Sequence, residues 1–549
     1  MVLIHHTSLL ALAFAGHTLG QKQDSSSALL SRGIEALGGT DRLEAIRDVT
    51  YVGGGIFRTY SLSQTFGLNG LDTMLAGAGR QNVTFSTQDG VLRQRIDRHH
   101  PLSPNFLFGR PNLEPMDFSM VVQDGDDGFA AVVEGSDLLF APGAPPGGYK
   151  DGYLAALLIN EATKMSPLLL LTILENNNHT ARVETTSAGV ELQAVYDGTL
   201  DLSVGFDAET HLPYLVRSRE NHNFFGLSTN DLVVHDYKTV NGVHFPHRFK
   251  TVYNNQHVMS DYSVADVLVN TGVPSARLQG PAGRLPSNTP TRDPVYGFAE
   301  IGLSNGFYSW GEYTGTFANF TATQRWKDLP GAWHVAVTDA PSYSQLILEV
   351  GDNVIVLDAP PHQSRLVMRW VREKLGKSVT HIWPSHHHHD HAYGVADYVA
   401  AGARVIALDD AVSYYYGIPK GRFVTYSDER PLTLKDGKTQ VTFMHMKNSV
   451  HSTDYGYVHV APRCTRKNSS TLVFEADGFG TSNAAEVDHN RFRTSLDAFS
   501  ASGIYHNATF VTAHGPVAPL AELIDVVGYP YPKNSPRDFK YLQSRCNRS

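Results

Sequence analysis

The sequence of 549 residues contains only two cysteines, Cys464 and Cys546. Neither has a candidate metal ligand close to it in the sequence, so a metal site built from thiolates is not indicated. In an oxidising compartment the two cysteines could form one disulfide that ties the C-terminal tail to the last domain. Two unpaired thiols are the alternative.

Basic blocks are also missing. Charged residues make up 18% of the chain, the formal net charge is −9 with histidine neutral, and lysine and arginine form no cluster. A surface for nucleic acid is therefore disfavoured. The chain has no internal repeats. Its length exceeds what one ordinary core accommodates, so two or three domains are expected.

The sequence lacks an apolar run that would make a stable membrane anchor. The stretch Ser8–Gly16 is too short to span a bilayer, and it is typical of a secretory signal peptide, residues 1–20, cleaved near Gly20. A frayed, mildly apolar terminus is the alternative. Glycosylation sequons agree with a secretory route and predict a secreted glycoprotein; they begin at Asn82, Asn178, Asn319, Asn468, Asn507 and Asn547.

Residues 21–279 are expected to form a β-rich N-terminal domain. An amphipathic helix is predicted over residues 24–45, interrupted at Gly38-Gly39, and a second helical patch over 152–175. Glu161, Lys164 and Glu175 make that second patch a buried or groove-lining helix and not a membrane span. Strands are predicted at 49–57, 91–96 and 132–139, and as short alternating segments across 181–270.

Asn241-Gly242, between two strand-like segments, predicts a hairpin turn within this domain. The region 25–270 resembles the curved half-barrel of bacterial lipoprotein-carrier proteins, in which an antiparallel sheet wraps an apolar groove. The resemblance is carried by the strand pattern and by no chemical motif. The alternative is an antiparallel domain that merely flanks the active one.

A stretch rich in proline, glycine, serine and asparagine predicts a linker over residues 280–296. From 297 to 549 the pattern changes to strands that alternate with helices, which indicates an α/β arrangement. Strands are expected at 333–337, 344–350, 353–357, 379–385 and 404–408, and helices at 364–375 and 392–401.

The most informative stretch of the chain is residues 386–391, four consecutive histidines followed by Asp390 and His391. It could be a metal-sticky run with no further meaning. Read as His-x-His-x-Asp-His, it offers His386, His388, Asp390 and His391 as ligands. Imidazole and carboxylate hold zinc and similar divalent metals. The stretch lies between a predicted strand and a predicted helix, so a rigid scaffold would fix the ligands.

These four residues are only half of the expected site, because one metal needs three protein ligands and two metals need more, so further ligands are expected downstream. His451 lies sixty residues beyond His391, and Asp477 and His514 each follow a predicted strand. His445 is a rival for His451, which is preferred because the following Ser-Thr suits a tight turn. His387 and His389 are expected to be spacers or neighbours of the ligands. His99 and His100 are expected to be ordinary surface residues.

These motifs in this order, with His-Gly-Pro at residues 514–516, resemble the metallo-β-lactamase superfamily over about residues 297–530. Residues 354–360 also resemble that family's early strand and turn, in which Asp358 is expected to be structural. The resemblance implies an α+β fold, with an αββα metallo-β-lactamase sandwich over residues 297–549 preceded by the antiparallel N-terminal domain.

Carried over by position, the resemblance implies two zinc ions. His386, His388 and His451 would hold the first, Asp390, His391 and His514 the second, and Asp477 would bridge them. A hydroxide between two cations is a strong nucleophile at neutral pH. Asp390 is the expected catalytic residue, because it could orient this hydroxide and pass its proton to the leaving group.

Departures from the family's subclasses narrow this interpretation. No cysteine stands among the ligands, which disfavours the antibiotic-degrading subclass that uses one. His388 stands where the di-iron electron-transfer members usually carry glutamate, which favours zinc hydrolysis. No cluster of basic residues suggests a nuclease member of the family.

The leading hypothesis is a secreted binuclear zinc hydrolase that cleaves an ester, lactone, thioester or amide bond. Its substrate would be a small molecule, lipophilic or a secondary metabolite, because the N-terminal half is expected to supply an apolar groove. The alternatives are a metal-dependent lyase, cyclase or oxidoreductase of secondary metabolism, or a lipid- or metabolite-binding protein with a structural metal site.

Overall fold

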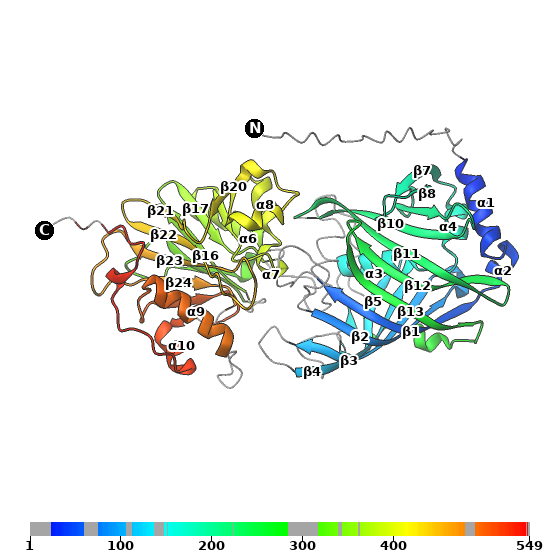
Figure 1. Cartoon of the computed structure of the whole chain (residues 1–549), viewed down its shortest axis with the longest axis horizontal. Coiled ribbons are helices and arrows are strands. Elements are labelled where there is room, and N and C mark those ends of the chain that lie inside the picture. The colour runs from blue at the N-terminus through cyan, green and yellow to red at the C-terminus, as the bar shows by residue number, and fades with distance from the viewer. Residues whose placement is uncertain are drawn as a thin grey trace, which may run out of the picture.

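The chain forms two lobes in the computed structural model, residues 24–283 and residues 317–546 (Figure 1). The predicted signal peptide, 1–20, and most of the predicted linker, 280–296, lie outside the described residues. The structure describes residues 24–59, 75–105, 112–136, 146, 148–150, 152–222, 224–283, 317–338, 343–360, 363–477, 489–515, 517–544 and 546.

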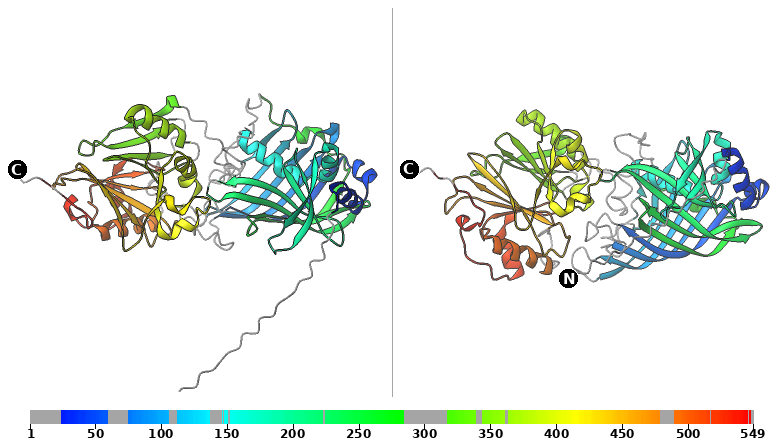
Figure 2. Two further views of the ribbon diagram at one scale, coloured as in Figure 1. Left: turned by 90° about the horizontal axis from the view of Figure 1, so that it is seen from above. Right: turned by 45° about the horizontal axis from the view of Figure 1, so that its top comes forward.

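One 13-stranded antiparallel sheet organises the N-terminal lobe and is strongly curved (Figure 2). Its order is β6-β5-β4-β3-β2-β1-β13-β12-β11-β10-β9-β8-β7, so the first strand also pairs with the last. The strands are β1 (Asp48–Thr59), β2 (Leu75–Ser86), β3 (Arg93–Asn105), β4 (Asn112–Gln123), β5 (Phe129–Gly135), β6 (Gly148–Tyr149), β7 (His179–Thr185), β8 (Glu191–Asp197), β9 (Leu202–Phe206), β10 (Pro213–His222), β11 (Gly226–Val240), β12 (Val243–Tyr253) and β13 (His257–Val269).

The predicted hairpin at Asn241-Gly242 is confirmed, because it joins β11 to β12. Both residues have positive φ angles, 51° and 80°, which asparagine and glycine tolerate and which a two-residue hairpin turn requires. The predicted strands 49–57 and 91–96 overlap β1 and β3. The predicted strand 132–139 ends at Gly135, and residues 137–139 lie outside the described residues.

Four helices accompany this sheet: α1 (Ser26–Leu37), α2 (Thr40–Glu44), α3 (Gly152–Lys164) and α4 (Leu169–Asn176). The predicted patch 152–175 is two helices, because Pro167 has no N–H with which to continue a helix. No single helix in the described ranges is long and apolar enough to cross a membrane; α3 and α4 together meet that criterion by length and composition, but they are bent by 103°.

The interior of the N-terminal lobe is largely filled by the chain itself. Side chains of α1 and α4 share a core with Tyr51 and Phe249, and the cavity left between them measures about 60 Å³. A wider cleft of about 970 Å³ crosses β1 to β5 and has a mixed lining that includes Gly53, Arg98 and Phe118. The likeness to a lipoprotein-carrier half-barrel stays a prediction.

The prediction that His99 and His100 are surface residues is wrong for His100. Successive side chains of β3 point to opposite faces of the sheet, so His99 lies at the surface beside Asp117 while His100 is fully buried. The ring of His100 stacks on Phe57, with centroids 5.1 Å apart. Burial, aided by the charge of Arg98, lowers the pKa of His100 to about 3, so this imidazole is neutral.

Two sheets stack face to face in the C-terminal lobe. Trp383 of the first packs against Phe443 and Phe474 of the second, with ring centroids 5.9 and 6.1 Å apart. The first sheet has seven strands in chain order and the second has six. They are β14 (Phe320–Thr323), β15 (Ala332–Val337), β16 (Ser344–Val350), β17 (Asn353–Leu357), β18 (His381–Trp383), β19 (Arg404–Leu408), β20 (Phe423–Tyr426), then β21 (Leu432–Lys435), β22 (Thr439–His445), β23 (Gly456–Pro462), β24 (Leu472–Glu475), β25 (Thr509–Thr512) and β26 (Ala518–Pro519).

Helices cover the outer faces of both sheets. On the first sheet lie α6 (Ser364–Trp370), which continues as one π-helical turn to Leu375, and α8 (Val395–Ala400); Trp370 of α6 packs on Trp333 with centroids 5.1 Å apart. On the second lie α9 (His489–Ser502) and α10 (Leu520–Val527). The layers therefore run helix, sheet, sheet, helix, which confirms the predicted α+β class and αββα sandwich.

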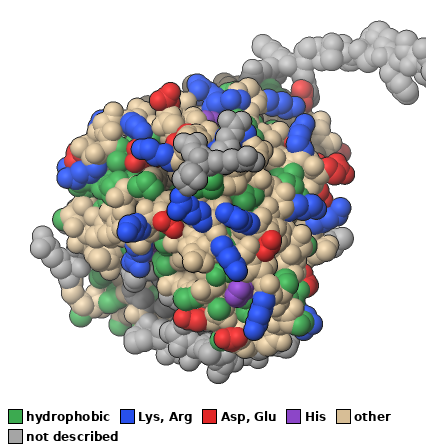
Figure 3. All heavy atoms as spheres, turned by 90° about the vertical axis from the view of Figure 1, so that its left-hand side faces the viewer, with side chains coloured by type: hydrophobic (Ala, Val, Ile, Leu, Met, Phe, Trp, Pro, Cys, Tyr) green, Lys and Arg blue, Asp and Glu red, His purple; other side chains and the backbone are tan. Residues whose placement is uncertain are grey.

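The surface of the C-terminal lobe agrees with its mixed composition. On the face drawn in Figure 3, basic and acidic side chains are interspersed. Among the sequons, Asn178, Asn468 and Asn507 are exposed, Asn82 and Asn319 are half-buried, and Asn547 lies outside the described residues. Glycosylation stays a prediction.

Cys464 and Cys546 form a disulfide, which is one of the two alternatives that the sequence left open, and the alternative of two unpaired thiols is wrong. The bond links the connection between β23 and β24 to the C-terminal tail, across 82 residues of sequence. A cross-link over so long a loop restricts the unfolded chain more than the folded one.

We expect the double substitution Cys464→Ser, Cys546→Ser to lower the free energy of unfolding of the C-terminal lobe by about 2–4 kcal/mol, because the unfolded chain regains the freedom that the cross-link removes. Denaturant unfolding followed by circular dichroism measures this. Reduction of the unsubstituted protein should give the same loss, and a stability that reduction leaves unchanged would contradict the prediction.

Candidate metal centre

Seven side chains that the sequence singled out converge at one edge of the two stacked sheets. β17, β18 and β19 are parallel, as are β24 and β25, and the carboxyl ends of parallel strands meet at one edge of a sheet. His386 and His388 follow β18, and α7 (His389–Ala392) carries Asp390 and His391. The loop from β22 to β23 brings His451, and Asp477 and His514 each lie two residues beyond β24 and β25.

The seven side chains divide into two groups that could each hold a cation. In each group one ligand atom per residue lies within 4.8 Å of all the others. The first group is His386, His388 and His451, and the second is Asp390, His391, Asp477 and His514. The sequence assigned the residues to two sets in the same way, with Asp477 shared. The structure thus brings together every predicted ligand, while their binding of metal stays a proposal.

Distances within the groups suit coordination to zinc. The Nε2 atoms of His386 and His451 are 3.2 Å apart, and those of His391 and His514 are 3.1 Å apart. Two imidazole nitrogens at tetrahedral positions on one zinc, with bonds of about 2.0–2.1 Å, stand about 3.3 Å from each other. Asp390 joins the second group through Oδ2, which lies 3.0 Å from His391 Nε2 and 3.1 Å from His514 Nε2.

Asp477 faces both groups. Its Oδ2 lies 3.5 Å from Nε2 of His386, 3.5 Å from Nε2 of His451 and 3.2 Å from Nε2 of His391. Its Oδ1 lies 3.1 Å from the guanidinium of Arg491 on α9, a buried residue that the sequence analysis missed. The position of Asp477 is the one that a bridging carboxylate requires.

Two buried oxygens in this cluster have no hydrogen-bond donor among the described residues: Oδ1 of Asp390 and Oδ2 of Asp477. An acceptor that is buried without a partner costs free energy of folding, unless a cation or water meets it. The donor set of five imidazoles and two carboxylates is also the set that divalent zinc prefers. The residues therefore fit a pair of divalent cations.

The two groups differ in protonation before any cation binds. Burial, reinforced by His388 and His391, holds the pKa of His386 well below its ordinary value, so its imidazole is neutral. Burial by itself would also lower the pKa of His391, but Asp390, Asp477 and Asp358 raise it well above the ordinary value. Burial would raise the pKa of Asp390, yet His391 and His514 hold it well below its usual range.

Asp358 orients one of the candidate ligands, which is the structural role expected for it. It follows β17 with a φ of 65°, and its Oδ1 accepts a hydrogen bond of 2.7 Å from the backbone N–H of Ser385. Its Oδ2 lies 2.9 Å from Nδ1 of His391. This contact leaves Nε2 of His391 available to a cation and makes that nitrogen a stronger metal ligand.

The two histidines predicted as spacers are buried behind the candidate ligands. His387 Nδ1 lies 2.8 Å from Oδ1 of Asp454, which ties the 386–391 segment to the loop of His451. His389 Nε2 lies 3.2 Å from the hydroxyl of Tyr414. The rival His445 contacts Asp428 and the carbonyl of Thr453 and belongs to neither group.

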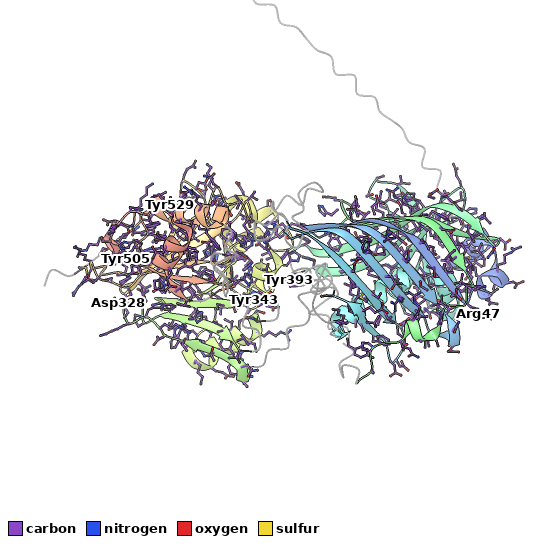
Figure 4. All side chains as sticks on the ribbon, turned by 90° about the horizontal axis from the view of Figure 1, so that it is seen from below. Arg47, Asp328, Tyr343, Tyr393, Tyr505 and Tyr529 are labelled. Atoms are coloured by element: carbon purple, nitrogen blue, oxygen red, sulfur yellow. A yellow bond between two sulfur atoms is a disulfide. The ribbon has the colours of Figure 1, made fainter. Side chains whose placement is uncertain are left out.

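Arg491, Asp454 and Tyr343 escaped the sequence analysis because no short motif marks them. Tyr343 packs on His514 with ring centroids 5.2 Å apart, and burial together with Asp390 and Asp477 raises its pKa well above the ordinary value. In Figure 4, Tyr343 and Tyr393 lie on the side of the C-terminal lobe that faces the N-terminal lobe. A single aromatic residue outside any motif gives no sequence signal for such a position.

We expect Asp358→Asn to weaken zinc binding by about 10–100-fold, because His391 loses the carboxylate that orients it. Asparagine keeps the size and tolerates the positive φ at this position. Competition with a chromophoric chelator measures the affinity. Asp352→Asn, at an exposed position in the turn before β17, is the control and should bind as the unsubstituted protein does.

Metal binding should release a proton from His391 at pH 7, because three carboxylates hold its pKa well above the ordinary value in the metal-free protein. Affinity should therefore rise as the pH rises towards that pKa. Titration calorimetry in buffers of different ionisation enthalpy counts the protons. A count of zero at pH 7 would contradict the prediction.

Residues 338–431 match the sequence model of one family, described as the metallo-beta-lactamase superfamily. No curated protein matches the chain. A metallo-beta-lactamase from Pontibacter korlensis is 15% identical with a TM-score of 0.29, over 38% of this chain and 99% of its own. One from Hirschia baltica is 18% identical with a TM-score of 0.28, over 39% and 99%. A flavo di-iron protein mutant from Thermotoga maritima is 12% identical with a TM-score of 0.30, over 39% and 61%. The residues that match the metallo-beta-lactamase superfamily model include the segment 386–391.

Proposed function

We propose that the chain is a secreted binuclear zinc hydrolase that cleaves an ester, lactone, thioester or amide bond of a small molecule. The observation that carries the proposal is the position of Asp477, whose Oδ2 faces histidines of both groups. A carboxylate that faces two cation sites is suited to a pair of metals that act together. The match to the superfamily supports the same reaction class.

His386, His388 and His451 would hold one zinc ion, Asp390, His391 and His514 the other, and Asp477 both. Zinc at these sites would lower the pKa of bound water and polarise the oxygen of the bond to be cleaved. Asp390 Oδ1, which is buried without a donor, would accept the proton of the attacking water and return it to the leaving group. Arg491 would hold Oδ1 of Asp477 and so keep Oδ2 turned towards the histidines.

We also propose that the substrate is lipophilic. The support is the aromatic side chain of Tyr343, which lies beside His514 on the side of the lobe that faces the N-terminal sheet (Figure 4). An aromatic ring beside a polar site favours a substrate with an apolar body and one polar reacting bond.

The test is hydrolysis of a panel of esters, lactones, thioesters and amides by zinc-loaded protein, by chelated protein and by chelated protein to which zinc is restored. We expect activity that chelation abolishes and zinc restores, and His388→Ala should lower kcat/KM by at least about 10³-fold, because it removes a ligand from the first group.

His445→Ala is the matched control for His388→Ala, since His445 lies near the site in sequence but contacts Asp428 instead. It should leave hydrolysis unchanged. If zinc-loaded protein cleaves no member of the panel, or if chelation leaves cleavage unchanged, the proposed function is wrong. A lyase, cyclase or oxidoreductase would convert substrate without net hydrolysis, and product analysis separates these outcomes.

A further inference from the structure

The turn between β10 and β11 of the N-terminal lobe reaches into the C-terminal lobe. His222 pairs with Gly226 at the end of this hairpin. Phe224, in the turn between them, is fully buried, although turn residues usually lie at the surface. Its ring centroid lies 5.3 Å from that of Tyr393, 5.6 Å from Tyr414 and 5.5 Å from Tyr415, all of the C-terminal lobe.

Backbone contacts fix the hairpin in this position. The carbonyl of Phe224 accepts a hydrogen bond of 2.6 Å from the N–H of Gly417. Phe225 stacks on Tyr416 with centroids 4.8 Å apart and ring planes 10° from parallel. A Cβ at Gly417 would lie 2.3 Å from the backbone nitrogen of Gly226 and 2.8 Å from the carbonyl oxygen of Phe224. Close approach of the two backbones therefore requires glycine at position 417.

The hairpin contacts the segment 386–391, which is called the metal loop below. His389, which lies between the candidate ligands His388 and Asp390, has its ring centroid 5.0 Å from that of Phe224 and 5.7 Å from that of His222. Its Nε2 contacts the hydroxyl of Tyr414, whose ring also packs on His387 with centroids 4.8 Å apart. Residues of both lobes thus contact His389.

We propose that the hairpin of His222, Phe224, Phe225 and Gly226 is a positioning element for the metal loop, so that the N-terminal lobe sets the metal affinity of the C-terminal lobe. The inference rests on the proposed metal site. His389 is fixed by the Phe224 ring, and His388 and Asp390, as its chain neighbours, are held through it. Packed interiors transmit small displacements because they contain few voids, and contacts behind metal ligands set affinity in this way.

The sharpest test is Gly417→Ala in the full chain. The atoms nearest to the added Cβ belong to the hairpin, and Gly417 has no positive φ. The substitution should therefore cause little strain within the C-terminal lobe itself. Gly421→Ala is the matched control, since its Cβ would meet nothing within 4 Å. We expect Gly417→Ala to weaken zinc binding by about tenfold or more and to change the absorption spectrum of the cobalt-substituted protein, with Gly421→Ala unchanged in both.

Phe224→Ala tests the same contact from the other lobe. It should weaken zinc binding in the same direction, and Phe224→Leu, which keeps most of the apolar contact, should recover most of the affinity. All affinities are measured by chelator competition at a temperature where the near-ultraviolet circular dichroism shows each metal-free variant to be folded. A loss of stability alone would lower the melting temperature without moving the affinity or the cobalt spectrum.

Two negative results have different meanings. If Gly417→Ala and Phe224→Ala bind zinc with unchanged affinity and give an unchanged cobalt spectrum, the hairpin only joins the lobes and the inference is overturned, while the proposed function stands. If the unsubstituted chain binds no zinc or cobalt, the proposed function fails first, and the inference fails with it.

Discussion

The carboxylate of Asp477 can meet both groups of histidines only if two separate sheets end at one edge. Strand β18 of the first sheet delivers His386 and His388, and strands β24 and β25 of the second deliver Asp477 and His514. The apolar packing of Trp383 against Phe443 and Phe474 holds the two sheets together. Burying so many polar side chains is unfavourable unless they are paired or bind cations. The hydrophobic sandwich therefore supplies the free energy that keeps the polar cluster together.

Support for the cluster comes from residues that touch no candidate metal position. Asp358 holds His391 and Ser385, Asp454 holds His387, and Arg491 holds one oxygen of Asp477. Asp358 and Arg491 fix which atom of His391 and of Asp477 remains available, and Asp454 fixes the segment 386–391 through His387. The N-terminal lobe adds contacts from a third direction, through Phe224 against His389. A site that carries this much charge in a small buried volume needs such contacts on every side, because its members otherwise repel or reorient one another.

Much of the fold and of the candidate site could be predicted from local patterns. Asn241-Gly242 specified a hairpin because two adjacent residues there need positive φ. The His-x-His-x-Asp-His spacing identified four candidate ligands, and the positions of Asp477 and His514 after apolar strands identified two more. His100 was misjudged because burial depends on which strands pair with β3 and on their register, and the sequence near His100 contains neither. The helix predicted over 152–175 is two helices, because Pro167 interrupts it. The prediction followed the continuous apolar pattern and gave too little weight to this proline.

The sequence by itself determined which residues could bind a metal and in what order, because ligand chemistry belongs to side-chain type and spacing. It also determined the change of pattern between the halves of the chain, and it identified two cysteines whose pairing the tertiary structure decided. Only the tertiary structure decided that His451 and not His445 faces the cluster, and that Arg491 meets Asp477. Only the tertiary structure brought Phe224 of one lobe against His389 of the other. The contact of Arg491 with Asp477 joins residues 14 positions apart, and that of Phe224 with His389 joins residues 165 positions apart. The choice of His451 depends on the direction of the loop between β22 and β23. All three depend on packing between elements, which no local pattern encodes.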